Sequence, residues 1–218
     1  MQLHRHLRAG EFRDRLLSRA KQARLTITAT EIDQLEAYYC LLSRWNRTIN
    51  LTALSLEPLC DDSVDRLLIE PLAVASHIPN AFGKWFDLGS GGGSPAIPLK
   101  IVRPLLGLTM VEARERKAAF LREVMRDLAL SDSAVVNERF ESLEDRTDFS
   151  GVASLVTVRA VRVDSILMRV SGHLLSSAGG RLFMLGRGEP QEGLSRFKTV
   201  ETVDLPVGSG SRLLIATV

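Results

Sequence analysis

The chain of 218 residues is long enough for one α/β domain with an appendage, and its 45% hydrophobic and 25% charged residues are ordinary for a globular protein. The net charge of +2 excludes a general polycation, so binding to nucleic acid would need a localised basic face. Cys40 and Cys60 lack C-x-x-C spacing, and no apolar stretch is long enough for a membrane span or marks a signal peptide. We therefore expect a cytoplasmic protein with no metal and no membrane contact.

The first 80 residues carry helical patterns. Positions 3–24 are rich in arginine, and these arginines form either a solvated face or a contact with RNA. Thr28 to Glu31 matches a capping box, after which apolar residues recur at helical spacing. A third helix is predicted from about Asp61 to His77, with a kink at Pro71. His77 fits a surface position at a helix end better than the role of a catalytic base.

A glycine loop follows the first predicted strand, in the segment Trp85-Phe86-Asp87-Leu88-Gly89-Ser90-Gly91-Gly92-Gly93-Ser94-Pro95-Ala96. This pattern predicts a strand, a tight loop and a helix. Glycines let a ligand approach the backbone closely, and the start of a helix offers unpaired N–H groups. Glu112 ends the second predicted strand, where a carboxylate can accept both hydroxyl protons of a ribose. The loop and this acid together favour an adenosine-containing cofactor over a purely structural turn.

The details of the loop favour S-adenosylmethionine among such cofactors. The third glycine of G-x-G-x-x-G is absent from its place, and Lys100 does not belong to a G-K-[ST] phosphate loop. Asp87, just before the first glycine, suits a ligand with an ammonium group, which S-adenosylmethionine has, whereas it carries no phosphate. The residues that we expect to bind it here are Asp87, Gly89, Gly91, Gly93, Ser94 and Glu112.

From Lys84 onward, strands and helices alternate as in βαβ units with a parallel sheet. We predict strands at 84–88, 107–111, 134–137, 154–158, 181–185, 198–203 and 212–218, and a helix at 115–130. The connection at 205–210 is too short for a crossover helix, so the last two strands must be antiparallel neighbours. The predicted fold class is α/β, with the Rossmann-like seven-stranded sheet of class I methyltransferases. This sheet would form a domain of residues 81–218, preceded by an N-terminal helical extension of residues 1–80.

Several motifs give the chain a resemblance to one family. They are Trp45 to Thr52 (W-N-x-x-x-N-L-T), Asp87 to Leu99 (D-[IV]-G-[ST]-G-x-G-x-P-G-I-P-L), the helical residues Arg116-Lys117, Phe120-Leu121 and Val124, then Arg139-Phe140-Glu141 and Val156 to Val161. These motifs occur in order over about residues 30 to 218. The chain thus resembles the 16S rRNA guanine-N7 methyltransferases called RsmG, or glucose-inhibited division protein B.

Four positions depart from the pattern of that family. Ala96 replaces the last glycine of the loop, and Ser154 stands where an aspartate often precedes the fourth strand. The family's Arg-His pair corresponds to Asp65-Arg66, so its histidine is missing. Its L-K-G corresponds to Leu185-Gly186-Arg187, so the lysine is lost. These differences concern the contacts with RNA more than the cofactor site.

The resemblance implies a monomeric enzyme that transfers a methyl group from S-adenosylmethionine to N7 of a guanine in the 16S rRNA of the small subunit. Arg159 is the predicted catalytic residue, because it ends the fourth strand beside the loop and could reach guanine O6, the cofactor carboxylate or both. A salt bridge to a loop carboxylate is its structural alternative. Phe140 and Glu141 should flank the adenine and also bind the cofactor, as should Arg159. Arg139 and Arg187 are predicted to contact RNA phosphates.

Two other functions stay open at this stage. One is a small-molecule methyltransferase whose helical front end is a lid. The other is a cofactor-binding regulatory protein without catalysis, which the lost lysine alone supports. The W-N-x-x-x-N-L-T motif favours the RNA-modifying enzyme over the small-molecule enzyme.

Overall fold

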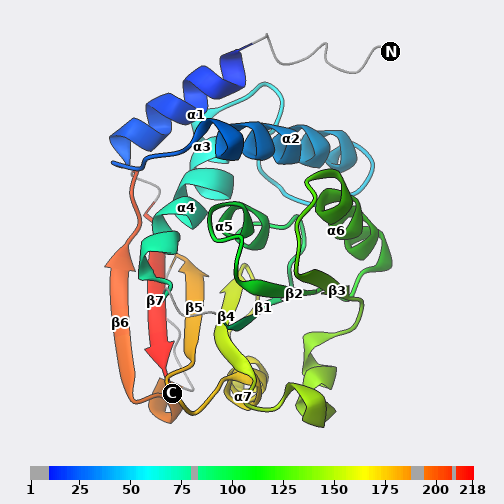
Figure 1. The fold of residues 1–218 in the computed structure, drawn as a ribbon, viewed down its shortest axis with the longest axis vertical. Coiled ribbons are helices and arrows are strands. Elements are labelled where there is room, and N and C mark those ends of the chain that lie inside the picture. Colours follow the sequence, from blue (N-terminus) through cyan, green and yellow to red (C-terminus); the bar gives the residue numbers. More distant parts are fainter. Residues whose placement is uncertain (1–9, 80–82, 188–193, 208–209) are drawn as a thin grey trace.

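A computed structural model describes residues 10–79, 83–187, 194–207 and 210–218, with a central sheet covered by helices on both faces (Figure 1). The strands are β1 (Lys84–Leu88), β2 (Gly107–Val111), β3 (Ser133–Val136), β4 (Ala153–Arg159), β5 (Arg181–Gly186), β6 (Thr199–Asp204) and β7 (Arg212–Thr217). Their order is β3-β2-β1-β4-β5-β7-β6, parallel except for β7, which is antiparallel to β5 and β6. The predicted seven strands and the antiparallel last pair are confirmed, with each strand boundary within one residue.

The helices group on the two sides of this sheet. One side carries α1 (Glu11–Gln22), α2 (Ala29–Asn46), α3 (Asp61–Val64), α4 (Glu70–Val74), α5 (Ala96–Val102) and α6 (Glu115–Asp127), and the other carries α7 (Ser165–Leu174) and the 3₁₀ turn Phe140–Asp145. The predicted helix at 115–130 is too long. Ala129 adopts a left-handed φ of 49°, and Leu130 N–H donates to Met125 O, a helix termination with a left-handed residue. Among the described helices, none has the length and apolarity to cross a membrane.

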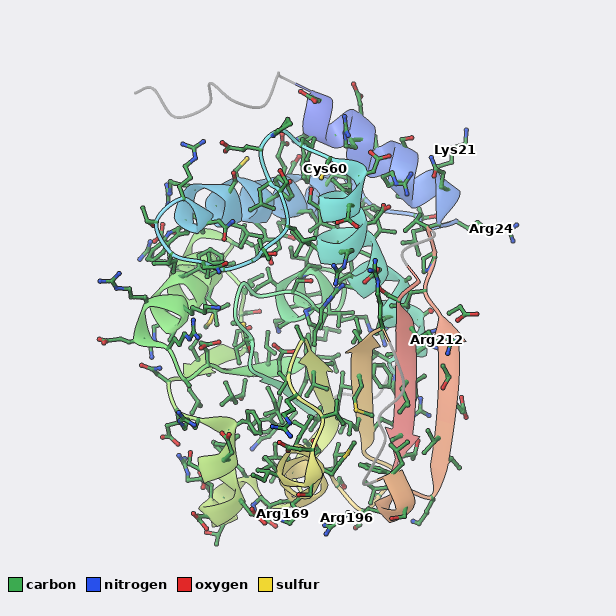
Figure 2. The ribbon with its side chains drawn as sticks, turned by 180° about the vertical axis from the view of Figure 1, so that it is seen from behind. Lys21, Arg24, Cys60, Arg169, Arg196 and Arg212 are labelled. Carbon is green, nitrogen blue, oxygen red and sulfur yellow. The ribbon has the colours of Figure 1, made fainter. Side chains whose placement is uncertain are left out.

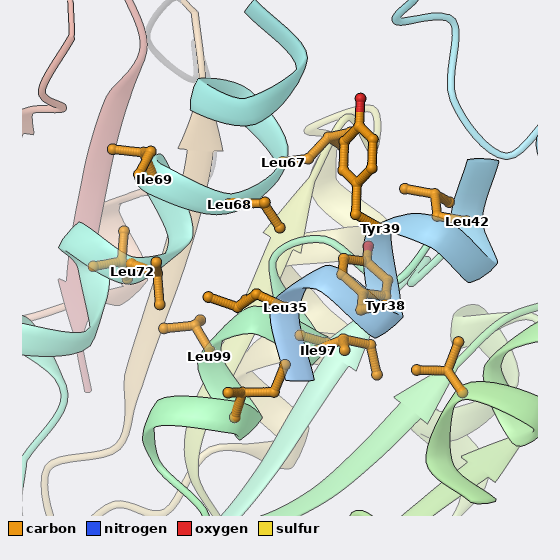
Figure 3. Close-up of a cluster of buried hydrophobic side chains, with 14 of the residues drawn as sticks. Leu35, Tyr38, Tyr39, Leu42, Leu67, Leu68, Ile69, Leu72, Ile97 and Leu99 are labelled. Carbon is orange, nitrogen blue, oxygen red and sulfur yellow. The ribbon is translucent and has the colours of Figure 1, made fainter. Parts of the chain in front are cut away.

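Side chains alternate along the strands, so each face of the sheet builds its own apolar cluster. Trp85, Leu155 and Phe183 face the larger cluster, whereas their neighbours Phe86 and Val156 face the cluster under α7. The larger cluster also takes in the N-terminal helices. Within it, side chains of α2, α4 and α5 interleave, as Figure 3 shows for Leu35, Tyr38, Leu72, Ile97 and Leu99. The glycine loop therefore rests on helices that precede the sheet in sequence.

The arginines of α1 are engaged in ion pairs with neighbouring helices. Arg13 pairs with Asp33 and Glu36, Arg15 with Asp61, and Arg19 with Asp61 and Asp65. These pairs attach α1 to α2 and to the helical stretch that begins at α3. They therefore favour neither of the two predicted roles, a solvated face or a contact with RNA, for these three residues. The remaining arginines at positions 5 and 8 lie outside the described residues.

Candidate cofactor site

The glycine loop has one side filled by protein and one side open. Gly93 has a φ of 87°, and a Cβ atom added there would lie 2.8 Å from Ile97 Cγ1, so this glycine is needed for packing on α5. Gly91 has a φ of 52°, and a Cβ atom there would meet nothing closer than the Gly89 carbonyl oxygen, at 3.7 Å. Because the open side is at Gly91, this is where a ligand can approach the backbone.

Asp87 lies at the base of the loop in a fully buried network. Trp85 Nε1 donates to Thr157 Oγ1 at 2.8 Å, and Thr157 Oγ1 donates to Asp87 Oδ1 at 2.5 Å. Burial raises the pKa of Asp87 to about 6. The side chain is 1% exposed, and one of its oxygens is engaged by β4. Its predicted contact with a ligand ammonium group stays a prediction, and its contact in this structure joins β1 to β4.

Glu112 follows β2 and turns its carboxylate toward the glycine loop. Its Oε2 accepts a hydrogen bond from Gly91 N–H at 2.9 Å, and its Oε1 accepts one from Arg114 N–H at 2.8 Å. Asn137, after β3, fixes the backbone by donating from Nδ2 to Glu112 O at 2.8 Å. A carboxylate held beside an open glycine suits a ribose diol, so these residues fit the adenosine part of S-adenosylmethionine. We did not predict the supporting role of Asn137.

Residues after β3 and β5 line the same edge of the sheet. Phe140 is half-buried and packs on the cluster under α7, and Glu141 follows it in the 3₁₀ turn Phe140–Asp145. Arg139 precedes this turn and Arg187 follows β5, and both side chains are exposed. Their predicted contacts with adenine and with phosphates stay predictions.

Arg159 ends β4 and is almost buried, with 10% of its side chain exposed. Its Nη2 donates to Glu70 Oε2 at 2.5 Å, and its Nη1 donates to Arg66 O. Burial lowers its pKa, and the charge of Glu70 opposes that change. The arginine predicted to contact the substrate therefore has an ion-pair partner, which is on a helix rather than on a loop.

The partners of Arg159 lie in a π-helical turn, Asp65–Ile69, between α3 and α4. Glu70 N–H donates five residues back to Asp65 O, so Arg66 O loses its usual donor. Pro71 has no N–H, so Leu67 O has no helical donor either. The side chain of Arg159 fills the first position, and Ser94 Oγ of the glycine loop fills the second at 3.0 Å. The predicted kink at Pro71 is therefore a π-helical turn that fastens the helical stretch to the loop.

Two residues that we assigned to motifs or to the core also support the loop. Tyr38, fully buried in α2, donates from its hydroxyl to Gly92 O at 2.6 Å. Leu51 of the W-N-x-x-x-N-L-T motif lies under the loop, since a Cβ atom added to Gly92 would lie 3.2 Å from Leu51 O. Asn46 of this motif accepts from Leu51 N–H and Thr52 N–H through Oδ1. The motif thus ends α2 and packs against the candidate site.

Known proteins match this chain in sequence and in fold. The family model GidB, rRNA small subunit methyltransferase G, matches residues 31–205. A relative from Xylella fastidiosa, "Ribosomal RNA small subunit methyltransferase G", is 38% identical over 187 residues, which are 83% of this chain and 84% of the relative. A relative of the same name from Xanthomonas oryzae pv. oryzae is 40% identical over 170 residues, 78% and 76% of the two chains. The crystal structure of a SAM dependent methyltransferase from Aquifex aeolicus is similar in fold, with a TM-score of 0.53 at 14% identity, covering 72% of this chain and 93% of that one.

Proposed function

Since the chain belongs to the GidB family, rRNA small subunit methyltransferase G, we propose that it methylates N7 of one guanine in the 16S RNA of the small ribosomal subunit. Membership confirms the predicted resemblance, the methyltransferase activity and the cofactor S-adenosylmethionine. The relatives do not favour the small-molecule alternative. The single observation that best supports a transfer site is the open face of Gly91, which lies between Glu112 after β2 and Arg159 at the end of β4.

The bound cofactor supplies an electrophilic methyl group on a sulfonium centre. Guanine N7 has a free lone pair at neutral pH, so the protein needs to align the two reactants rather than remove a proton. The residues for this task are on the page: the loop admits the cofactor at Gly91, Glu112 orients the ribose, and Arg159 stands at the adjoining strand end. Because Arg159 is already bound to Glu70, it offers a fixed rather than a mobile guanidinium group.

The test is methyl transfer from labelled S-adenosylmethionine to small ribosomal subunits that lack N7 methylation. We expect one equivalent of label, on N7 of one guanine of the 16S RNA, by mass spectrometry of the digested RNA. Label on another nucleotide atom would contradict the N7 assignment. Label on small molecules but not on subunits would support the lid enzyme, and no transfer at all would support the regulatory protein.

The basic residues without partners gather around the mouth of the site. The loops after β2, β3, β4 and β5 each bear an exposed arginine with no ion pair among the described residues: Arg114, Arg139, Arg162 and Arg187. Phosphates bind to such arginines, because a free guanidinium group exchanges no existing partner for them. We infer that the RNA contacts this rim, rather than the paired arginines of α1.

Binding of small-subunit RNA should therefore weaken steeply with salt, because phosphate contacts release counterions. The double change Arg139→Ala and Arg187→Ala should lower the slope of log K against log salt by about 1 to 2 units. Lys21→Ala with Arg24→Ala is the matched control: both residues are exposed and project away at the end of α1 (Figure 2), so the slope should not change. Filter binding at several salt concentrations measures both. Equal slopes for the two double variants would contradict the rim.

The rate of methyl transfer should be nearly flat between about pH 6.5 and 8.5, because neither guanine N7 nor arginine titrates there. The two described histidines lie at the opposite edge of the sheet: His77 O accepts from Arg181 at the start of β5, and His173 O accepts from Gly151 before β4. Asp87, with a pKa of about 6, ionises below this range. Single-turnover rates across the range measure the profile, and a steep rise with one ionisation near neutrality would reveal a missed base.

A further inference from the structure

A small cluster of charged side chains lies where the π-helical turn meets the end of β4. It consists of Arg66, Glu70 and Arg159, with Glu70 fully buried and Arg159 at 10% exposure. Arg66 lies close enough for its charge to act on Arg159. Only one ion pair is formed, between Arg159 Nη2 and Glu70 Oε2.

Two buried atoms of this cluster have no hydrogen-bond partner among the described residues: the donor Arg66 Nε and the acceptor Glu70 Oε1. Buried polar groups are nearly always paired in native proteins, so each such atom indicates a missing partner. Two guanidinium groups share one carboxylate, so the cluster also has an excess of one positive charge. The missing partner should therefore be an anion that also carries a hydrogen-bond donor.

The order of the strands gives this partner a source. Glu112, the expected ribose contact, follows β2; the glycine loop follows β1; and Arg159 ends β4, which is the next strand along. Two strand spacings, about 10 Å, separate β2 from β4. A cofactor whose ribose lies at Glu112 and which crosses the loop at Gly91 extends its other end toward the cluster. In S-adenosylmethionine that end is an α-amino acid, with one carboxylate and one ammonium group.

We propose that Arg66 and Glu70 form the subsite for the amino-acid end of the cofactor. Arg66 Nε donates to the carboxylate, Glu70 Oε1 accepts from the ammonium group, and Arg159 keeps the Glu70 carboxylate in place. This subsite deepens the proposed function and rests on its cofactor. It also assigns the ammonium group to Glu70, whereas the sequence suggested Asp87.

Two other ligands fit the cluster less well. An RNA phosphate is anionic but has no donor for Glu70 and would have to enter a site where that residue is fully buried. A guanine has both a donor and an acceptor but no negative charge, and it becomes positive when N7 is methylated. The excess positive charge of the cluster would then oppose the reaction.

Calorimetric titration with two ligands tests the subsite without any RNA. S-adenosylhomocysteine carries the amino-acid end, and 5′-methylthioadenosine has the same adenosine and sulfur without it. Arg66→Ala should weaken S-adenosylhomocysteine by at least about tenfold, the scale of a hydrogen bond to a charged group, and should change the affinity for methylthioadenosine less than about twofold. Glu70→Gln should show the same selectivity, with thermal melting as a check on folding. Arg162→Ala, an exposed arginine on the same edge, is the matched control and should affect neither ligand.

Each outcome separates the possibilities. Unchanged affinity of Arg66→Ala for S-adenosylhomocysteine would overturn the subsite, and a simultaneous loss of RNA binding would assign Arg66 to a phosphate. Unchanged cofactor affinity with slower transfer and unchanged RNA binding would assign it to the guanine. Equal weakening of both ligands would overturn the subsite as a structural effect. If the wild-type chain bound neither ligand, the failure would lie in the proposed function itself.

Discussion

Gly91→Val should abolish the binding of S-adenosylmethionine while the fold survives. The added side chain would project into the open side of the loop, where no protein atom lies closer to a Cβ than 3.7 Å, so it competes with the ligand rather than with the core. A left-handed φ of 52° adds a strain of about 1–2 kcal/mol, which a stable domain tolerates. Calorimetric titration measures the affinity, and thermal melting measures the remaining stability.

Gly151→Val is a suitable control for that strain. Gly151 also has a left-handed φ, of 65°, with open space around its Cβ position, but it precedes β4 at the opposite edge of the sheet. It should lose similar stability and keep its affinity for the cofactor. Undiminished affinity in folded Gly91→Val would show that the ligand binds elsewhere, and comparable affinity for NAD would contradict the choice of cofactor.

Arg159→Ala should lower turnover by orders of magnitude and also lower the stability of the protein. The substitution leaves the Glu70 carboxylate buried without its partner, which costs about 3–5 kcal/mol in comparable buried pairs. It also removes the donor to Arg66 O, which releases the π-helical turn from the end of β4. Single-turnover methylation of small subunits and chemical denaturation measure the two effects separately.

The double change Arg159→Met with Glu70→Gln distinguishes a role in the reaction from a role in folding. Replacing both members of a buried pair by neutral residues of similar size is often nearly neutral for stability. We therefore expect denaturation close to that of the wild-type chain, while turnover stays low. Recovery of both stability and turnover would mean that Arg159 acts only as an ion-pair partner.

The strands could be predicted to within one residue because their signals are local. Apolar runs such as Leu108 to Val111 end at acids, glycines or turns, and the alternation of inward side chains follows from the pleat. The glycine loop and Glu112 could be placed on one edge for a similar reason, since successive parallel strands end on the same side of a sheet. Family motifs then identified the cofactor.

The partners of charged side chains could not be predicted, because they depend on contacts between distant segments. The pair of Arg159 and Glu70 spans 89 positions, and the pair of Arg13 and Asp33 joins two separate helices. The π-helical turn was missed for the same reason. A kink at Pro71 can be read locally, but the side chains that fill the freed carbonyls come from Ser94 and Arg159. Local patterns show that a carbonyl loses its donor, and only the fold shows what replaces it.

The missing N–H of Pro71 has a consequence for how sequences of this family can vary. A residue with an N–H at this position would restore a helical donor to the turn, and Ser94 and Arg159 would then compete for acceptors that are already taken. Conversely, a chain that loses the serine or the arginine leaves a carbonyl unpaired unless the proline is lost too. Positions 71, 94 and 159 should therefore vary together among relatives, although they lie in three different elements and only two of them adjoin the cofactor site.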